Sequence, residues 1–258
     1  MVVKALACGA SLMLLAALRP ASARAVVVPT PVAPYSLSTF AVSQNGYSKP
    51  DSITFSRTNV FVGYGNGGNP DGSGGAMSTI VKYKMDGTVM KTYTVVGHND
   101  GLRFNYATGD LWALQNEDGN STLVIIEPGS GKQKTFTLGT GPHGGGYDDL
   151  VFDGNSVFIS ASAPTLATNT APAIVSLKLK GKKVTLTGVL NGNASAINVT
   201  TGTTVALNLQ DPDSMIRDPF GELILDCLNR TEKAMTQAHA FKAAELCLRA
   251  QAAARRIT

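Results

Sequence analysis

The chain has 258 residues, of which 43% are hydrophobic, and it carries 22 Lys and Arg against 18 Asp and Glu. The positive excess belongs to the two ends, because residues 26–226 hold 13 basic and 16 acidic side chains. Such a mildly acidic body lacks the net positive charge typical of nucleic-acid-binding domains, so we expect no nucleic-acid partner. The stretch between Cys8 and Cys227 has no cysteine, which excludes a scaffold built on disulfides.

Residues 1–25 have the features of a secretory signal peptide. Lys4 precedes an apolar run from Ala5 to Leu18, and Ala21-Ser22-Ala23 follows as a small-x-small cleavage pattern. The run is too short to span a bilayer, and no later stretch approaches the length that a membrane span needs. The sequence therefore predicts a periplasmic or secreted protein without a membrane span.

Residues 26–44 are rich in Pro and Val at their start and are expected to form an extended leader. Within it, Leu37–Val42 has the composition of one strand. In a ring of sheets such a strand often completes the last sheet, so it could pair far away in sequence.

Residues 45–226 repeat one short phrase, an aspartate two positions before an apolar residue. The copies begin at Asp51, Asp100, Asp148 and Asp213, with about 50 residues between the first three and a longer third interval. Each copy is followed by a turn and a second β-rich run. A repeat of this length with about four short strands is typical of β-propeller blades.

Alternation of apolar and polar residues places the strands within each repeat. In the first repeat the predicted strands are Ile53–Phe55, Asn59–Tyr64, Thr79–Met85 and Val89–Val95. In the second they are Leu102–Phe104, Leu111–Leu114, Thr122–Glu127 and Gln133–Leu138. In the third they are Leu150–Phe152, Val157–Ser160, Ala173–Leu179 and Val184–Leu190. The fold class is therefore all-β, with four-stranded blades of the propeller type.

The fourth repeat is predicted to be half a blade. Residues 191–211 are expected to be a connection, followed by a strand opening at Asp213 and a second strand at Glu222–Leu225. About three and a half blades make an incomplete ring, which leaves two apolar faces uncovered.

Residues 227–258 differ sharply in composition, with no Gly, Pro, Asp, Val or Tyr. They are rich in Ala and other helix formers, so we expect an atypical helical tail that makes few apolar contacts with the β body. Two explanations stay open: a genuine helix, or a coding sequence interrupted after Asp226.

The repeat openings resemble those of secreted propellers related to the NHL-repeat and gluconolactonase-like proteins. Pro50-Asp51-Ser52-Ile53 and Pro212-Asp213-Ser214-Met215 match that opening well, whereas Asp148-Asp149-Leu150 matches it loosely. The resemblance implies the propeller fold, and for gluconolactonase-like members a metal-assisted hydrolase. The motif marks the start of a strand and specifies no chemistry.

The aspartates Asp51, Asp100, Asp148 and Asp213 are expected to gather at one mouth of the central channel, where the innermost strands begin. The ends of the second strands should bring Asn116, Glu117, Asp118 and Asp226 to the same face. Oxygen-rich clusters of this kind suit Ca²⁺ or another divalent cation. The alternative is that each aspartate only accepts hydrogen bonds from its own turn, as a residue repeated in every blade often does.

His98 and His143 are less regular features, in loops that precede the innermost strands of neighbouring blades. Together with Asp100, Asp148 and Asp149 they could bind a transition metal or act as general acid and base. The alternative is that both are ordinary polar loop histidines, because their spacing to the next aspartate differs.

Three other features are predicted to be structural. The glycine-rich residues 63–75 have no phosphate-binding signature and are read as a loop between strands. Gly129-Ser-Gly-Lys132 is read as a hairpin turn, and Trp112 as a core residue.

Two functions remain open at this stage. The first is an exported, non-catalytic propeller-type binding or scaffold protein for an unknown small molecule or protein. The second is a metal-dependent lactonase- or esterase-like hydrolase, of the Ca²⁺ type, that acts at the channel mouth.

Overall fold

The computed structural model describes residues 36–42, 46–162, 165, 167–198 and 200–217. The chain divides into two compact units, residues 39–246 and a second made of residues 1–38 with 247–258. The predicted signal peptide, the predicted strand at 222–225 and the tail at 227–258 lie outside the described residues.

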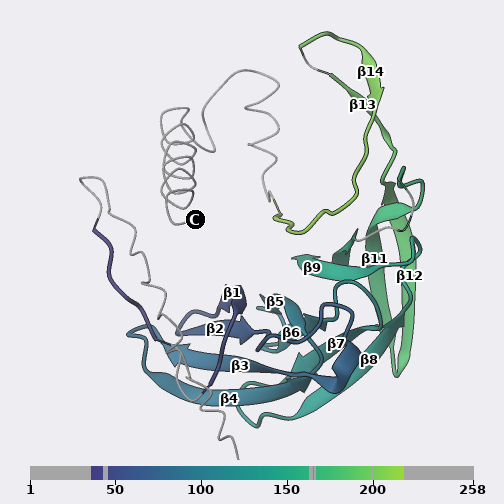
Figure 1. Ribbon diagram of the computed structural model, residues 1–258. Helices are drawn as coiled ribbons and strands as arrows, with labels where there is room; N and C mark the ends of the chain where they lie inside the picture. The colour runs from purple at the N-terminus through teal and green to yellow at the C-terminus, as the bar shows by residue number, and fades with distance from the viewer. Residues whose placement is uncertain (1–35, 43–45, 163–164, 166, 199, 218–258) are drawn as a thin grey trace, which may run out of the picture. The chain divides into compact units, whose positions relative to one another are not determined.

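Three four-stranded antiparallel sheets follow one another along the chain (Figure 1). The first sheet consists of β1 (Pro50–Phe55), β2 (Asn59–Tyr64), β3 (Met77–Lys84) and β4 (Val89–Val96). The second consists of β5 (Asn99–Phe104), β6 (Leu111–Gln115), β7 (Ser121–Ile126) and β8 (Gln133–Gly139). The third consists of β9 (Gly146–Asp153), β10 (Ser156–Ser162), β11 (Pro172–Lys180) and β12 (Lys183–Asn191). All twelve strands agree with those predicted from alternation, which confirms the all-β class.

The strand order is the same simple meander in each sheet, so β1, β5 and β9 are inner strands that lie side by side (Figure 1). Contacts join β1 to β5 and β5 to β9, while β4, β8 and β12 form the outer edges. The described sheets make an open series and do not close into a ring. This arrangement is compatible with propeller-like blades.

The apolar side chains pack between neighbouring sheets. Leu111 and Ala113 on β6 face the first sheet, whereas Trp112 and Leu114 face the third, as the two-residue period of a strand requires. Trp112 is buried and meets Phe152 edge to face at 5.2 Å, so it is the core residue that the sequence predicts. Burial of each large apolar side chain stabilises the folded state by about 1.5–3 kcal/mol.

The segment Leu37–Val42 is not the strand that the sequence predicts. Phe40 and Ala41 pack by their side chains against the outward face of the first sheet, where Phe40 meets the ring of Tyr83 edge to face at 5.9 Å and Ala41 joins the same apolar cluster. A segment that covers a face through its side chains makes no backbone ladder with the sheet, which explains the difference.

The fourth repeat also departs from expectation. Residues 211–217 form no strand. The backbone of Met215 bonds to side chains instead: its N–H donates to the Asp149 carboxylate at 3.0 Å, and its carbonyl accepts from Arg103 at 3.1 Å. The preceding connection contains a short hairpin that was not predicted, β13 (Ser195–Ile197) with β14 (Thr204–Ala206).

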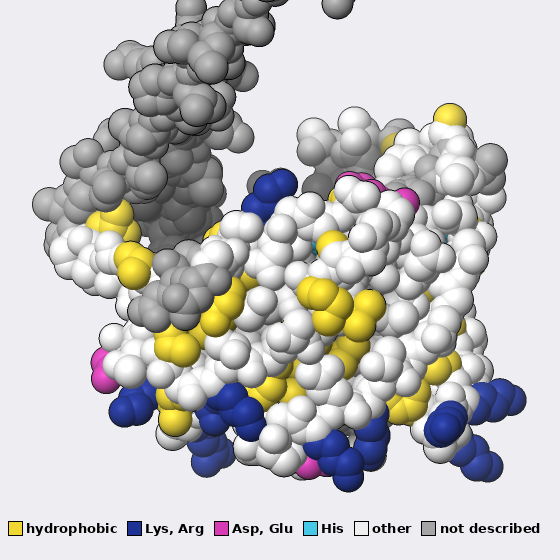
Figure 2. All heavy atoms as spheres, turned by 60° about the horizontal axis from the view of Figure 1, so that its bottom comes forward, with side chains coloured by type: hydrophobic (Ala, Val, Ile, Leu, Met, Phe, Trp, Pro, Cys, Tyr) yellow, Lys and Arg dark blue, Asp and Glu magenta, His cyan; other side chains and the backbone are white. Residues whose placement is uncertain are grey.

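The antiparallel order separates the charged side chains along the sheets. The inner strands begin at one end, here called the carboxylate end, where Asp51, Asp100 and Asp148 lie. The β3–β4, β7–β8 and β11–β12 turns lie at the opposite end, here called the lysine end. Figure 2 shows most of the Lys and Arg side chains in view along its lower margin, and a row of acidic side chains on the upper margin.

Candidate functional site

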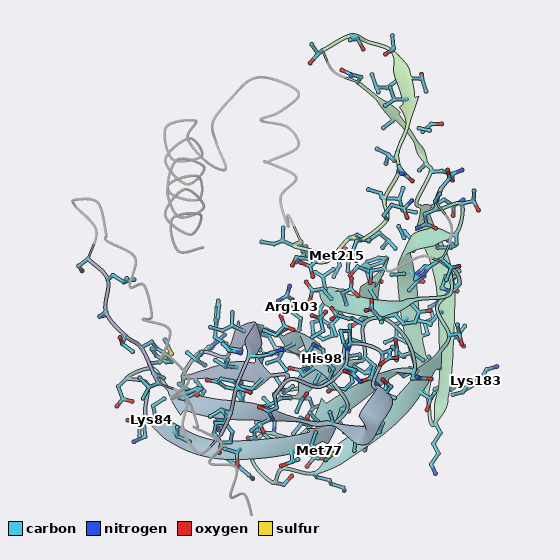
Figure 3. The ribbon with its side chains drawn as sticks, in the orientation of Figure 1. Met77, Lys84, His98, Arg103, Lys183 and Met215 are labelled. Atoms are coloured by element: carbon cyan, nitrogen blue, oxygen red, sulfur yellow. The ribbon has the colours of Figure 1, made fainter. Side chains whose placement is uncertain are left out.

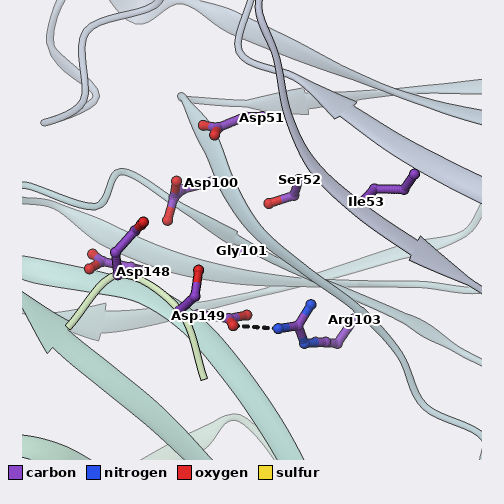
Figure 4. A pocket seen from close by; sticks show the side chains of 10 residues that line it. Asp51, Ser52, Ile53, Asp100, Gly101, Arg103, Asp148 and Asp149 are labelled. Carbon is purple, nitrogen blue, oxygen red and sulfur yellow. Dashed lines mark hydrogen bonds and ion pairs between the residues drawn. The ribbon is translucent and has the colours of Figure 1, made fainter. Parts of the chain in front are cut away.

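The carboxylate end contains a pocket of about 240 Å³ between the starts of the inner strands (Figure 4). Its lining includes the aspartates that the sequence singles out: Asp51, Asp100, Asp148, Asp149 and Asp213. The three inner strands begin side by side, so an aspartate at the start of each strand reaches the same space. Of the residues predicted for a channel mouth, the structure thus brings together Asp51, Asp100, Asp148 and Asp213, whereas Asp226 lies outside the described residues.

Three carboxylates approach one another most closely, those of Asp100, Glu117 and Asp148. One oxygen from each lies within 4.8 Å of the other two. Asp100 and Asp148 come from β5 and β9, and Glu117 comes from the turn that follows β6. We call this group the carboxylate triad. Asp51 and Asp213 line the same pocket but do not belong to the triad.

The triad is buried enough to disturb its protonation. Asp148 is 1% exposed, and burial, with the nearby carboxylates of Glu117, Asp211 and Asp213, raises its pKa to about 8. Burial raises the pKa of Asp100 as well, and the negative charge of Glu117 raises it further. The pKa of Glu117 is also raised, chiefly by burial. Three carboxylates this close cannot all be ionised without a compensating proton or cation.

Glu117 is positioned by an ordered turn. Asn116 adopts a left-handed conformation (φ 66°), and its side-chain oxygen accepts from the His98 N–H at 2.9 Å. Gly146 allows the third sheet to approach, because a β-carbon there would lie 1.9 Å from the Glu117 carbonyl oxygen. This close approach brings Glu117 of the second sheet near Asp148 of the third.

His98 lies beside Glu117 of the triad. Its Nδ1 donates to the Gly68 carbonyl at 3.1 Å, so the glycine-rich loop after β2 orients the ring. Its Nε2 then faces Asp51 at 3.6 Å and Glu117 at 3.7 Å. A histidine held in this way can exchange a proton with groups in the pocket.

His143 is not part of this arrangement. It is 5% exposed, its Nδ1 accepts from the Gly145 N–H at 3.1 Å, and its carbonyl accepts from the Thr165 N–H at 3.1 Å. Among the described residues no hydrogen bond or ion pair joins it to His98 or to the triad. The described contacts therefore join His98 to Glu117 of the triad, whereas those of His143 stay within its own loop and with Thr165.

Asp149 has a different role from its neighbour Asp148. It forms an ion pair with Arg103 and accepts from the Met215 N–H, so it fastens residues 211–217 beside β9 (Figures 3 and 4). Asp148 instead accepts a hydrogen bond from the hydroxyl of Ser162. Asp149 thus makes a structural contact, whereas its neighbour Asp148 belongs to the triad.

Sequence reasoning missed Arg103. It occupies the fourth position of the repeated phrase, where the other copies have Thr54, Val151 and Ile216. A single charge at a position that is otherwise uncharged was the signal available, since a buried guanidinium needs an acidic partner.

Comparisons with known proteins give no family. No protein-family model matches the chain, and no curated protein matches it. Among solved structures, one described as the crystal structure of the computationally designed Ika4 protein matches with a TM-score of 0.37 and 14% identity. That match covers 67% of this chain and 99% of the designed chain, and it is too distant to support any inference. No helix in the described residues is long and apolar enough to cross a membrane.

Proposed function

We propose that this protein is a propeller-type binding protein that holds a divalent cation of the Ca²⁺ type in the carboxylate triad. The observation that carries the proposal is the convergence of the buried Asp100 and Asp148 with the half-buried Glu117, whose ligand oxygens lie within 4.8 Å of one another. Hard cations prefer carboxylate oxygens, and a bound cation would offset the repulsion that raises these pKa values. The pocket beside the triad would then admit a small ligand whose oxygens complete the coordination.

The first function inferred from the sequence, an exported binding or scaffold protein, is kept in this form. The relation to NHL-repeat and gluconolactonase-like propellers belongs to the proposal too. The four-stranded antiparallel sheets and the aspartates at the inner strand starts support it, while export rests on the signal-peptide pattern alone.

Calorimetric titration of Ca²⁺ into the full chain tests the proposal. We expect one binding event in the wild type, weakened at least about tenfold in Asp100→Asn. Asp86→Asn is the matched control, because Asp86 is an exposed aspartate in the β3–β4 turn at the lysine end. Equal heats from the wild type and Asp100→Asn would remove the triad from consideration, as would a loss of binding in the control.

One observation favours a second candidate, a metal-dependent hydrolase of lactones or esters. His98 directs Nε2 toward Asp51 and Glu117 at the pocket edge, where it could accept a proton from an attacking water. The cation would polarise the carbonyl of the substrate. Turnover of simple lactones and aryl esters with Ca²⁺, abolished in His98→Gln, would support this candidate, and equal rates in the variant would refute the role of His98.

A further inference from the structure

The lysine end concentrates nearly all lysines of the body. In the first sheet, Lys82, Lys84 and Lys91 lie on or beside the β3–β4 turn. In the second sheet, Lys132 and Lys134 lie at the β7–β8 turn. Because the strands alternate in direction, these turns are at the same end, far along the strands from the triad.

The third sheet adds the densest group. Lys178 and Lys180 end β11, and Lys182 and Lys183 begin the return along β12. Nine of the ten lysines between residues 26 and 226 thus lie at this end, and we call them the lysine band. Figure 3 labels two lysines of the band, Lys84 in the first sheet and Lys183 in the third sheet.

No lysine of the lysine band forms an ion pair within the described structure. The described ion pairs involve His98, Arg103 and Arg217, and no lysine among the described residues joins a carboxylate. Seven of the nine are exposed, and the half-buried Lys91 donates to the Gly129 carbonyl at 2.8 Å. The acidic groups at this end are few, and one of them, Asp153, already pairs with Arg217.

Because the charges are segregated, the net charge of the body does not describe the surface at either end. The described residues carry 13 basic and 13 acidic side chains, a balance that averages the carboxylate end with the lysine end. What a partner meets at the lysine end is a strongly positive surface, which attracts anions within about 10 Å at moderate ionic strength.

The side chains of the lysine band favour a membrane over a polyanion chain. Lysines act as point charges, whereas nucleic-acid readers rely on the bidentate and stacking contacts of arginine. Among the described residues only two arginines lie at this end, Arg57 in the β1–β2 turn and Arg217, which is already paired with Asp153. Apolar groups are interspersed: Met85 is 61% exposed and Met90 is 49% exposed. Exposed methionines gain from contact with lipid headgroups and acyl chains, and lysines reach anionic headgroups while their stems cover apolar surface.

We propose that the lysine end docks onto an anionic lipid bilayer. The carboxylate triad would then lie at the end of the sheets that faces away from the bilayer, open to solutes. Docking of this kind is electrostatic and reversible, and it requires no segment that crosses the membrane.

Vesicle co-sedimentation of the full chain tests this proposal, with vesicles of phosphatidylcholine alone or mixed with phosphatidylglycerol in about 0.1 M salt. We expect binding to the mixed vesicles only. Each lysine near an anionic surface strengthens binding about fivefold, so the triple variant Lys180→Gln, Lys182→Gln, Lys183→Gln should bind about 100-fold more weakly. The matching arginine variant should keep full binding, which separates loss of charge from loss of fold.

Lys49→Gln is the matched control, because Lys49 is exposed and lies just before β1 at the carboxylate end. It should bind like the wild type. Equal binding to neutral vesicles, or undiminished binding by the triple glutamine variant, would overturn the proposal. Retention on immobilised DNA or heparin without any vesicle binding would overturn it in favour of a polyanion chain.

Discussion

Replacing Asp148 by Asn should remove much of the pH dependence of folding stability in the cation-free protein. Asp148 is buried in the triad with a pKa of about 8, whereas an unfolded aspartate titrates near about 3.9. The folded state therefore keeps a proton that the unfolded state loses between these two values. Because the folded pKa is raised, stability is greatest below about pH 4 and falls as pH rises toward about 8.

The size of the effect follows from the one retained proton. Stability should fall by about 1.4 kcal/mol per pH unit across this window for each such carboxyl group. For a domain of about this size, 1 kcal/mol corresponds to about 2–4 °C in melting temperature. Asp100 also contributes to the pH dependence of stability in the wild type. The Asp148→Asn variant should therefore lose the part of the slope that one carboxyl group gives and keep the part that Asp100 gives.

Melting temperatures in the presence of a chelator, measured from about pH 5 to about pH 8, give this slope directly. Asp86→Asn serves as control, because hydrogen bonds to Thr88 lower the pKa of Asp86, and its stabilising effect is lost only in more acidic solution. A slope for Asp148→Asn that equals the wild-type slope would refute the buried, proton-retaining triad.

Further predictions concern packing and the contacts around the site. Gly146→Ala should destabilise the protein by several kcal/mol, because the new methyl group would collide with the Glu117 carbonyl, and chemical denaturation measures the loss. Arg103→Met should lower the free energy of unfolding by about 3 kcal/mol, because it leaves Asp149 buried without its cation. The double variant with Asp149→Asn should recover part of that loss. A double variant no more stable than the single one would contradict the pairing. Leu123→Ala should cost about 2–5 kcal/mol in the core between the second and third sheets, and a cost below about 1 kcal/mol would contradict its burial.

Much of the fold could be predicted because its signals are local. Alternation in Ile80–Met85 and the Asp86-Gly87 turn specify a hairpin without reference to distant residues, and Gly87 indeed adopts a left-handed conformation (φ 84°). The proximity of Asp51, Asp100 and Asp148 could also be predicted, because each aspartate opens a repeated strand and the repeated strands start at the same end.

The remaining features depend on contacts between residues far apart in sequence. Residues 37–42 and 213–217 have strand-like composition, but whether they pair depends on the partners that they meet. The Arg103–Asp149 ion pair links positions 46 residues apart, and the unusual charge at position 103 of the sequence does not indicate which acid it meets. The lysine band was hidden for the same reason, because the net charge of a sequence does not report how the topology distributes its charges.

If the triad is a cation site, protons and a divalent cation compete for its carboxylates. The most direct measurement is the number of protons released when Ca²⁺ is added to the full chain in weakly buffered solution near neutral pH. With Asp148 and Asp100 both protonated beforehand, we expect about two protons per bound ion, and fewer in Asp148→Asn. Absence of Ca²⁺ binding, or binding without proton release, would contradict this competition.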